Sequence, residues 1–374
     1  MDLSISRLIA AAALVAVGLS PAPVHAGPTP KVTCEACLVL DDTGRVLFAR
    51  HPRRLLPNAS TTKMITALVT RRETAPDEVV TVSAEAAATG GGGLDLVAGE
   101  SYSVGDLLEA LLLTSSNDAA VALAEHVAGS EAAFVHEMNE LALAVGARRT
   151  NFVTAHGLDQ PGHHSTAVDL ARIAEEVLSD PALAAIVAAP STTIEGPKGA
   201  ILLENRNLLL ESYRGAIGVK TGYTAGAGNV LVAAAERHDR RLITVVLDSD
   251  DSFVDSTALL DLGFRKLRRG LLLEEGVPVG ALVFDGAGST GAVATDSVRG
   301  ITDPSSVVIT FAPEDVQPPF VEGERVGTIV IRDSSGRVVG EVDAATDASV
   351  PAPHSPWGQD FLADLLRLAA AAAP

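Results

Sequence analysis

Residues 57–63 read Pro-Asn-Ala-Ser-Thr-Thr-Lys and open a predicted helix that continues through Leu68. Positions three apart lie on one face of a helix, so the side chains of Ser60 and Lys63 can meet. Near the helix start, the backbone N–H of Ser60 is free to bind a developing oxyanion. A serine hydroxyl becomes a good nucleophile when an adjacent base takes its proton, and lysine can be that base if burial and a neighbouring cation lower its pKa. Taken alone, Ser-x-x-Lys is a weak signal, because a helix cap beside a surface lysine gives the same pattern.

The chain of 374 residues is acidic and poor in lysine. Its formal charge is −19, and only five of its 28 basic residues are lysines: Lys31, Lys63, Lys198, Lys220 and Lys266. An acidic chain without a basic stripe is a poor nucleic-acid binder, because phosphate contacts supply most of that affinity. A hydrophobic fraction of 47% supports a sizeable core, and the length predicts two domains.

Two further motifs strengthen the first one, and each contains residues suited to acyl transfer. Ser115–Asn117 follows the apolar part of a helix predicted over residues 104–128, where a hydroxyl could shuttle a proton and an amide could hold a substrate amide. Lys220–Gly222 opens a predicted strand, where an ammonium and a hydroxyl could bind a carboxylate and a missing side chain lets a substrate backbone approach. The backbone N–H of Tyr223 would be a second oxyanion donor. The order of the three motifs is that of serine acyl-enzyme chemistry.

With these motifs the sequence resembles the D-alanyl-D-alanine carboxypeptidases of the low-molecular-mass penicillin-binding proteins, serine peptidases that trim peptidoglycan stem peptides. The resemblance covers about residues 35–345 and is most specific at residues 57–63, 113–119, 150–158, 205–209 and 218–228. It implies an α+β fold, in which a β-lactamase/DD-peptidase-like domain with an antiparallel sheet and helices precedes a small all-β domain. It also implies that peptidoglycan stem peptides and β-lactam antibiotics are ligands and that no cofactor or metal is needed.

The resemblance implies a role for each motif residue. Ser60 would be the nucleophile and Lys63 its base, and Ser115 would pass the proton to the leaving D-alanine. The substrate-binding residues would be Asn117, Lys220, Thr221, Gly222, Tyr223 and Arg206. Among them, Lys220 and Thr221 would face the terminal carboxylate of the substrate, and Arg206 would support the charge balance of the strand.

The composition divides the chain into four segments. Residues 1–26 are typical of a secretory signal, with Arg7 before an apolar run too short to span a membrane. Residues 27–270 are expected to form the catalytic domain and 271–348 a small β-rich domain. Residues 349–374 are expected to be a tail with a short amphipathic helix, also compatible with weak peripheral membrane contact. These features predict an exported protein of the periplasm or another extracytoplasmic compartment, associated with the cell wall.

Three rival functions remain open. A β-lactamase would need a deacylating glutamate, and residues 150–166 contain none. A DD-endopeptidase cutting cross-links would use the same site. A peptidoglycan-binding scaffold with slow turnover finds support in one departure from the family: residues 248–255 hold no arginine where relatives often carry one that binds the substrate carboxylate. The peptidase efficiency is therefore open, although acylation is expected.

Several other polar residues have simpler interpretations. Cys34 and Cys37 form either a local disulfide, which requires a turn between them, or two free thiols. His156 is interpreted as structural, and the pair at residues 163–164 would bind a metal only with partners elsewhere. The acidic run 248–255 is interpreted as a solvated exit from a hairpin, and the glycines at 90–93 as a flexible loop.

Overall fold

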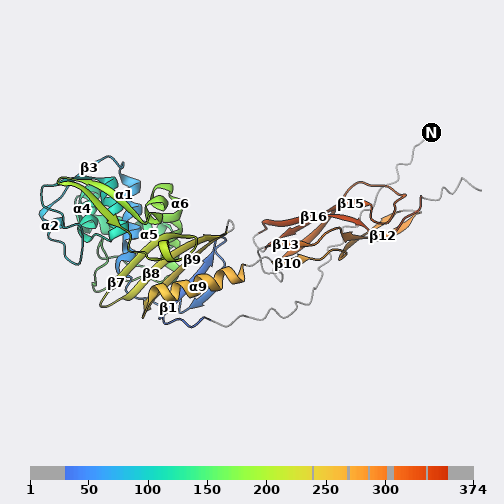
Figure 1. The fold of residues 1–374 in the computed structure, drawn as a ribbon, viewed down its shortest axis with the longest axis horizontal. Coiled ribbons are helices and arrows are strands. Elements are labelled where there is room, and N and C mark those ends of the chain that lie inside the picture. The colour runs from blue at the N-terminus through green and yellow to red at the C-terminus, as the bar shows by residue number, and fades with distance from the viewer. Residues whose placement is uncertain are drawn as a thin grey trace, which may run out of the picture. The chain divides into compact units, whose positions relative to one another are not determined.

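The computed structural model describes residues 30–352, except 238–239, 268–269, 285–286, 301–306 and 334–335. The predicted signal at residues 1–26 lies outside the described residues, as does most of the predicted tail at 349–374. The described chain forms two units, of which the first is Gly27–Arg265 and the second begins at Lys266 (Figure 1).

The first unit is built on a five-stranded antiparallel sheet in the order β2-β1-β9-β8-β7. Its strands are β1 (Ala36–Asp41), β2 (Val46–Arg50), β7 (Ala216–Thr224), β8 (Gly228–Arg237) and β9 (Arg240–Ser249). Two two-stranded sheets accompany it, formed by β3 (Val79–Thr81) with β4 (Ser101–Ser103) and β5 (Ser191–Gly196) with β6 (Gly199–Glu204). The apolar runs of β8 and β9 are buried along almost their whole length because helices cover both faces of the sheet.

Helices of the first unit pack on both faces of its five-stranded sheet. The helices of this unit are η1 (Ala59–Thr62), α1 (Lys63–Glu73), α2 (Ala84–Ala87), α3 (Val104–Glu109), η2 (Ala110–Thr114), α4 (Asn117–Ala128), α5 (Glu131–Ala144), α6 (Ala167–Ser179), α7 (Pro181–Ala188), α8 (Leu209–Ser212) and α9 (Ser252–Lys266). Helix α6 packs on β1, β8 and β9, and its buried Leu170, Ile173, Ala174 and Val177 repeat with helical spacing. Helix α9 lies on the opposite face, where Gly263 is close to Val39 and Leu242. Side chains alternate along a strand, so Val39 points away from Leu38 and Leu40, which belong to the core beside α6.

The segment predicted as one helix over residues 104–128 is broken in the structure. After α3 the chain widens into the π-helical turn η2, and Ser115 then adopts a left-handed conformation with φ 65°. The backbone N–H of Ser116 donates to Ala110 O at 3.2 Å, and α4 begins at Asn117. The expectation of a continuous helix is therefore wrong. The break takes Ser115 out of the helix and makes Asn117 the first residue of α4, and both residues are buried.

The second unit is made of strands in the residues that the structure describes. An antiparallel sheet has the order β11-β12-β16-β15-β14, and a smaller pair joins β10 to β13. The bounds are β10 (Gly270–Leu273), β11 (Pro278–Phe284), β12 (Gly288–Ala294), β13 (Val298–Gly300), β14 (Val308–Pro313), β15 (Arg325–Arg332) and β16 (Val338–Thr346). Its core is separate and includes Ile329, Ile331 and the rings of Phe284 and Phe320, whose centroids lie 5.2 Å apart. The predicted fold class, an α+β domain followed by a small all-β domain, is confirmed.

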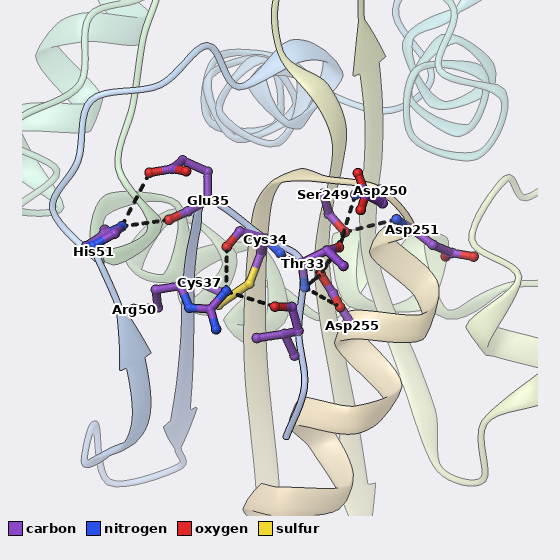
Figure 2. The surroundings of a disulfide bond; sticks show 11 residues. Thr33, Cys34, Glu35, Cys37, Arg50, His51, Ser249, Asp250, Asp251 and Asp255 are labelled. Carbon is purple, nitrogen blue, oxygen red and sulfur yellow. Dashed lines mark hydrogen bonds and ion pairs between the residues drawn. A yellow bond between two sulfur atoms is a disulfide. The ribbon is translucent and has the colours of Figure 1, made fainter. Parts of the chain in front are cut away.

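Cys34 and Cys37 form a disulfide at the start of the first unit, which decides between the two alternatives left open above. The chain bends at Glu35, so their Cα atoms are 6.2 Å apart, within the reach of a bridge. Figure 2 shows that the segment before β1 is also bound by Asp255 of α9, whose carboxylate accepts from the backbone N–H groups of Thr33 and Cys34. The acidic run 248–255 thus anchors the chain rather than forming a purely solvated exit, as the 2% exposure of Asp255 also shows.

Searching the described residues for a membrane-crossing helix finds none of sufficient length and apolarity.

Candidate active site

Ser60 and Lys63 meet at the junction of η1 and α1. Ser60 is partly exposed, whereas Lys63 is completely buried. Lys63 Nζ donates to Ser60 Oγ at 3.1 Å, to Asn117 Oδ1 at 2.6 Å and to the backbone O of His156 at 2.6 Å. These three acceptors fix the amine beside the hydroxyl, which is the contact that a serine–lysine pair needs for proton transfer.

The electrostatic surroundings of Lys63 favour its neutral form. Burial lowers its pKa well below the ordinary value, and the positive charges of Lys220 and Arg206 lower it further. Asp118 acts in the opposite direction with a smaller effect. A buried lysine whose pKa is lowered in this way can accept a proton near neutral pH.

Asn117 is oriented by hydrogen bonds on both sides of its amide. Its Oδ1 accepts from Lys63, while its Nδ2 donates to Gly90 O at 2.9 Å. Its backbone N–H donates to Gly92 O at 3.0 Å. Ser115, two residues earlier, is 8% exposed at the left-handed turn. A non-glycine residue held in this conformation is a strained feature of the kind that clusters at functional sites.

Lys220 and the residues after it lie on β7, the edge strand beside η1. Lys220 is 1% exposed and donates to Thr221 O at 3.0 Å. Burial and the neighbouring charge of Arg206 lower its pKa to about 7. Arg206 is held by its own backbone N–H, which donates to Leu113 O at 3.1 Å. Lys220 and Arg206 therefore give this site a local positive charge on an acidic chain.

The glycine of this strand is required by the approach of β7 to the nucleophile. A Cβ on Gly222 would lie 3.0 Å from the N atom of Ser60 and 3.1 Å from the Cβ of Ala59. Contacts this short leave no room for a side chain. Thr221 is half-buried beside it, and the Tyr223 side chain is 67% exposed.

The structure brings some of the predicted site residues into direct contact and places others near them without a hydrogen bond. Ser60, Lys63 and Asn117 are in direct contact, and Lys220 and Arg206 are close enough to change the pKa of Lys63. Gly222 touches the nucleophile segment. No hydrogen bond within the described chain joins the side chains of Ser115 or Thr221 to these residues, and their placement follows from their neighbours in sequence.

Sequence reasoning missed the part that the glycines at 90–93 play. Their backbone carbonyls bind Asn117, and a Cβ on Gly93 would lie 2.3 Å from the carboxylate of Asp118. Asp118 in turn accepts from the backbone N–H groups of Leu94 and Leu96. The run is a loop, as interpreted, and its carbonyls hold it against the first residue of α4. Asp118 is distant from these glycines in the sequence, so no local pattern indicated the contact.

The two buried histidines have hydrogen-bond partners that account for them. Burial lowers the pKa of each to about 4, and His156 Nδ1 accepts from the backbone N–H of Leu158 at 3.1 Å. His163 Nε2 lies 2.8 Å from Thr62 Oγ1. Across the described ranges, no cluster of three or more His, Cys, Asp or Glu side chains could hold a metal ion.

Comparison with known proteins agrees with this geometry. The family model described as D-alanyl-D-alanine carboxypeptidase matches residues 24–251. The D-alanyl-D-alanine carboxypeptidase DacD of Salmonella typhimurium is 36% identical over 297 residues, which cover 74% of this chain and 75% of the relative.

Solved structures of related proteins also align with this chain, each over a different share of its length. Penicillin-binding protein 5 from Haemophilus influenzae aligns with a TM-score of 0.62 at 28% identity, covering 87% of this chain and 99% of its own. A variant of the Streptomyces K15 DD-transpeptidase aligns with a TM-score of 0.61 at 28% identity, covering 63% of this chain and 100% of its own. The expectation of an enzyme of the serine-type carboxypeptidase class is confirmed, and the chain belongs to the D-alanyl-D-alanine carboxypeptidase family.

Proposed function

We propose that this protein removes the terminal D-alanine from peptidoglycan stem pentapeptides through an acyl-enzyme on Ser60. The observation that carries the proposal is the 3.1 Å contact between Lys63 Nζ and Ser60 Oγ, made by a buried lysine whose pKa is lowered. A neutral Lys63 can take the hydroxyl proton as Ser60 attacks, and no other base contacts Ser60 Oγ among the described residues.

The reaction has two balanced halves. In the first, Ser60 Oγ bonds to the carbonyl carbon of the penultimate D-alanine and its proton passes to Lys63. The tetrahedral oxyanion is bound by the backbone N–H groups of Ser60 and Tyr223. The C–N bond then breaks, the proton returns through Ser115 to the leaving nitrogen, and free D-alanine departs. In the second half, water attacks the ester, one of its protons goes to Ser60 Oγ as the C–O bond breaks, and the other passes to solvent as the acid product ionises to the carboxylate.

Substrate recognition is assigned to the positive side of the site. Lys220 and Thr221 would bind the terminal carboxylate, with Arg206 beside them, and Asn117 would hold the substrate amide. Because residues 248–255 contain no arginine, this recognition rests more heavily on Lys220. β7 is the edge strand of its sheet, so a substrate backbone would lie along its unpaired edge.

The proposal places the protein outside the cytoplasm, where peptidoglycan and β-lactams are found. Its support is the signal-like sequence of residues 1–26, the disulfide of Cys34 with Cys37, and membership of a family of peptidoglycan enzymes. Cleavage after Ala26 in the mature protein, read by N-terminal sequencing of the exported form, would test this placement.

The acyl-enzyme is tested by intact-protein mass spectrometry after incubation with penicillin. We expect one penicillin mass on the wild type and none on Ser60→Ala. Ser101→Ala is a matched control, because Ser101 is exposed on β4 away from the site and should leave labelling unchanged. Covalent penicillin on Ser60→Ala would contradict the assignment.

The products distinguish this activity from its rivals. D-Alanine release from a stem pentapeptide supports the carboxypeptidase, whereas monomers from a cross-linked dimer without that release would indicate a DD-endopeptidase. Release no faster than in buffer, with acylation intact, would indicate a scaffold protein. The same assay with an added amine acceptor reports any transfer of the acyl group to an amine in place of water.

A further inference from the structure

The peptide bond between Ala59 and Ser60 is held on its carbonyl side by unusual contacts. Ala59 is 2% exposed and has φ 46°, a conformation that non-glycine residues rarely adopt. Its carbonyl oxygen accepts from Thr62 Oγ1 at 2.8 Å. Gly157 lies close to the same oxygen, because a Cβ added to this glycine would be only 2.1 Å from it. The carbonyl is therefore oriented by the Thr62 hydroxyl, in a space that only a glycine at position 157 leaves free.

The Thr62 hydroxyl has three hydrogen-bond partners, which occupy all of its donor and acceptor positions. Asn58 Nδ2 donates to Thr62 Oγ1 at 2.8 Å, and His163 Nε2 lies 2.8 Å from the same oxygen. A hydroxyl has two acceptor positions and one hydrogen. If both nitrogens donate to it, its only hydrogen must go to Ala59 O.

The tautomer of His163 shows that its Nε2 is a donor. The backbone N–H of Val153 donates to His163 Nδ1 at 3.1 Å, so that nitrogen carries no hydrogen. The ring is 5% exposed, and burial keeps its pKa near 4, so it is neutral at neutral pH. A neutral imidazole with an acceptor Nδ1 carries its hydrogen on Nε2. His163 thus donates to Thr62, and Thr62 donates to Ala59 O.

We propose that His163 is a positioning residue, which acts through the Thr62 hydroxyl to orient the Ala59–Ser60 peptide. A peptide unit is planar, so the direction of its carbonyl also sets the direction of its N–H. The N–H of this unit belongs to Ser60 and is the first oxyanion donor of the proposed function, on which this inference rests. Oxyanion donors work when they are aimed in advance at the developing charge. The hydrogen bonds from His163 to Thr62 and from Thr62 to Ala59 O fix the direction of this N–H, although His163 takes no part in the reaction itself.

The test begins with two substitutions of Thr62, each of which changes one group of the threonine side chain. Thr62→Val removes the hydroxyl and keeps the shape, whereas Thr62→Ser keeps the hydroxyl. For Thr62→Val we expect a penicillin acylation rate at least about tenfold below that of the wild type, but short of the ~10²–10³-fold loss seen when an oxyanion donor is deleted. Thr62→Ser should stay close to the wild type. The dissociation constant of the non-covalent complex should change little in either variant.

Infrared spectroscopy of the acyl-enzyme separates orientation from general damage. With a ¹³C-labelled β-lactam carbonyl, we expect the ester band to shift to higher frequency in Thr62→Val, because a misaligned N–H polarises the carbonyl less. A merely structural role would lower the folded fraction and leave the band of the folded protein in place. An unchanged band in the folded Thr62→Val protein would overturn the proposal, whether or not the acylation rate falls.

Substitutions of His163 give a second test that survives if Thr62→Val fails to fold. His163→Asn keeps an acceptor at the Nδ1 position but ends short of Thr62, whereas His163→Gln places an N–H near the Nε2 position. We expect His163→Asn to lose rate and shift the band as Thr62→Val does, and His163→Gln to recover most of both. Equal behaviour of the two variants would overturn the proposal.

The double variant tests whether His163 acts through Thr62. Thr62→Val with His163→Asn should acylate no more slowly than Thr62→Val alone, because residues in one chain of contacts are not additive. Losses that multiply would show independent roles and would also overturn the inference. Failure of the proposed function is seen separately, as absence of penicillin on Ser60 in the wild type.

Discussion

At the scale of single residues, the proposed chemistry depends on two lysines that are both buried. Lys63 and Lys220 are both almost inaccessible to solvent, and the charge on Lys220 is among the causes that lower the pKa of Lys63. Arg206 acts on both of them in the same direction. The arrangement makes one lysine available as a base and keeps positive charge for a carboxylate. Two of the five lysines of this acidic chain are thus buried, where burial disfavours the charged form of the amine.

The two lysines predict a bell-shaped pH dependence of kcat/KM for D-alanine release. Activity should rise with pH as Lys63 loses its proton and becomes a base, because its lowered pKa brings this step toward neutral pH. It should fall again above the pKa of Lys220, about 7, as the charge that binds the substrate carboxylate is lost. On the alkaline side the decline should approach about tenfold per pH unit. Initial rates with a stem pentapeptide between about pH 5 and 10 measure this dependence.

Lys220→Arg is the matched variant for the alkaline limb. A guanidinium stays charged far above neutral pH, so the decline should move to higher pH even though the geometric mismatch lowers the maximum rate. An alkaline limb at the same pH in this variant would show that another group titrates. Unfolding measured across the same pH range controls for loss of native protein.

At the scale of elements, the local motifs could be predicted and the long-range contacts could not. Ser60 and Lys63 share one turn of chain, so helical spacing alone predicted their contact. The break at Ser115 was missed because apolar residues with helical spacing stand on both sides of the polar run 114–118, which was read as part of one helix although Ser and Asn are typical helix-cap residues. The tertiary contacts of Asn117 with Lys63 and the glycine run outweigh that local preference.

The element that enters β1 is stabilised by the disulfide and by Asp255. The bridge closes a loop of four residues, for which the chain-entropy model gives about 2 kcal/mol. We expect Cys34→Ala with Cys37→Ala to lower the free energy of unfolding by about that amount, measured by urea titration under oxidising conditions. Reduction of the wild type should give a loss of similar size.

Penicillin acylation should be unaffected by the same double substitution. Strands β9 and β8 separate β1 from β7, which places the disulfide roughly 14 Å from the β7 edge at the usual strand spacing. Equal stability of the double variant and the wild type would mean that Asp255 alone holds this segment, through the contacts drawn in Figure 2. Reduced acylation in native protein would mean that the sheet transmits the change.

At the scale of the whole molecule, each unit has a hydrophobic core of its own. The core of the first unit joins α1, α4 and α6 to the sheet, and that of the second unit is formed by its strands. The site residues all belong to the first unit, from Ser60 to Tyr223. The Streptomyces K15 DD-transpeptidase variant aligns over its whole length with only 63% of this chain. A protein of this fold can therefore be built without a counterpart of the remainder.

A chain shortened after Lys266 should consequently fold and be acylated by penicillin at nearly the full-length rate, whereas one shortened after Asp251 should not fold. The family match ends at residue 251, yet α9 follows it and belongs to the first unit. Leu259, Leu260 and Leu262 of α9 are buried, and each is worth about 1.5–3 kcal/mol against a total stability of about 5–15 kcal/mol. Deleting α9 also removes Asp255 from the start of β1 and uncovers one face of the sheet. Circular dichroism and penicillin labelling of the two shortened chains measure the difference; an unfolded chain ending at Lys266 would show that the first unit depends on the second.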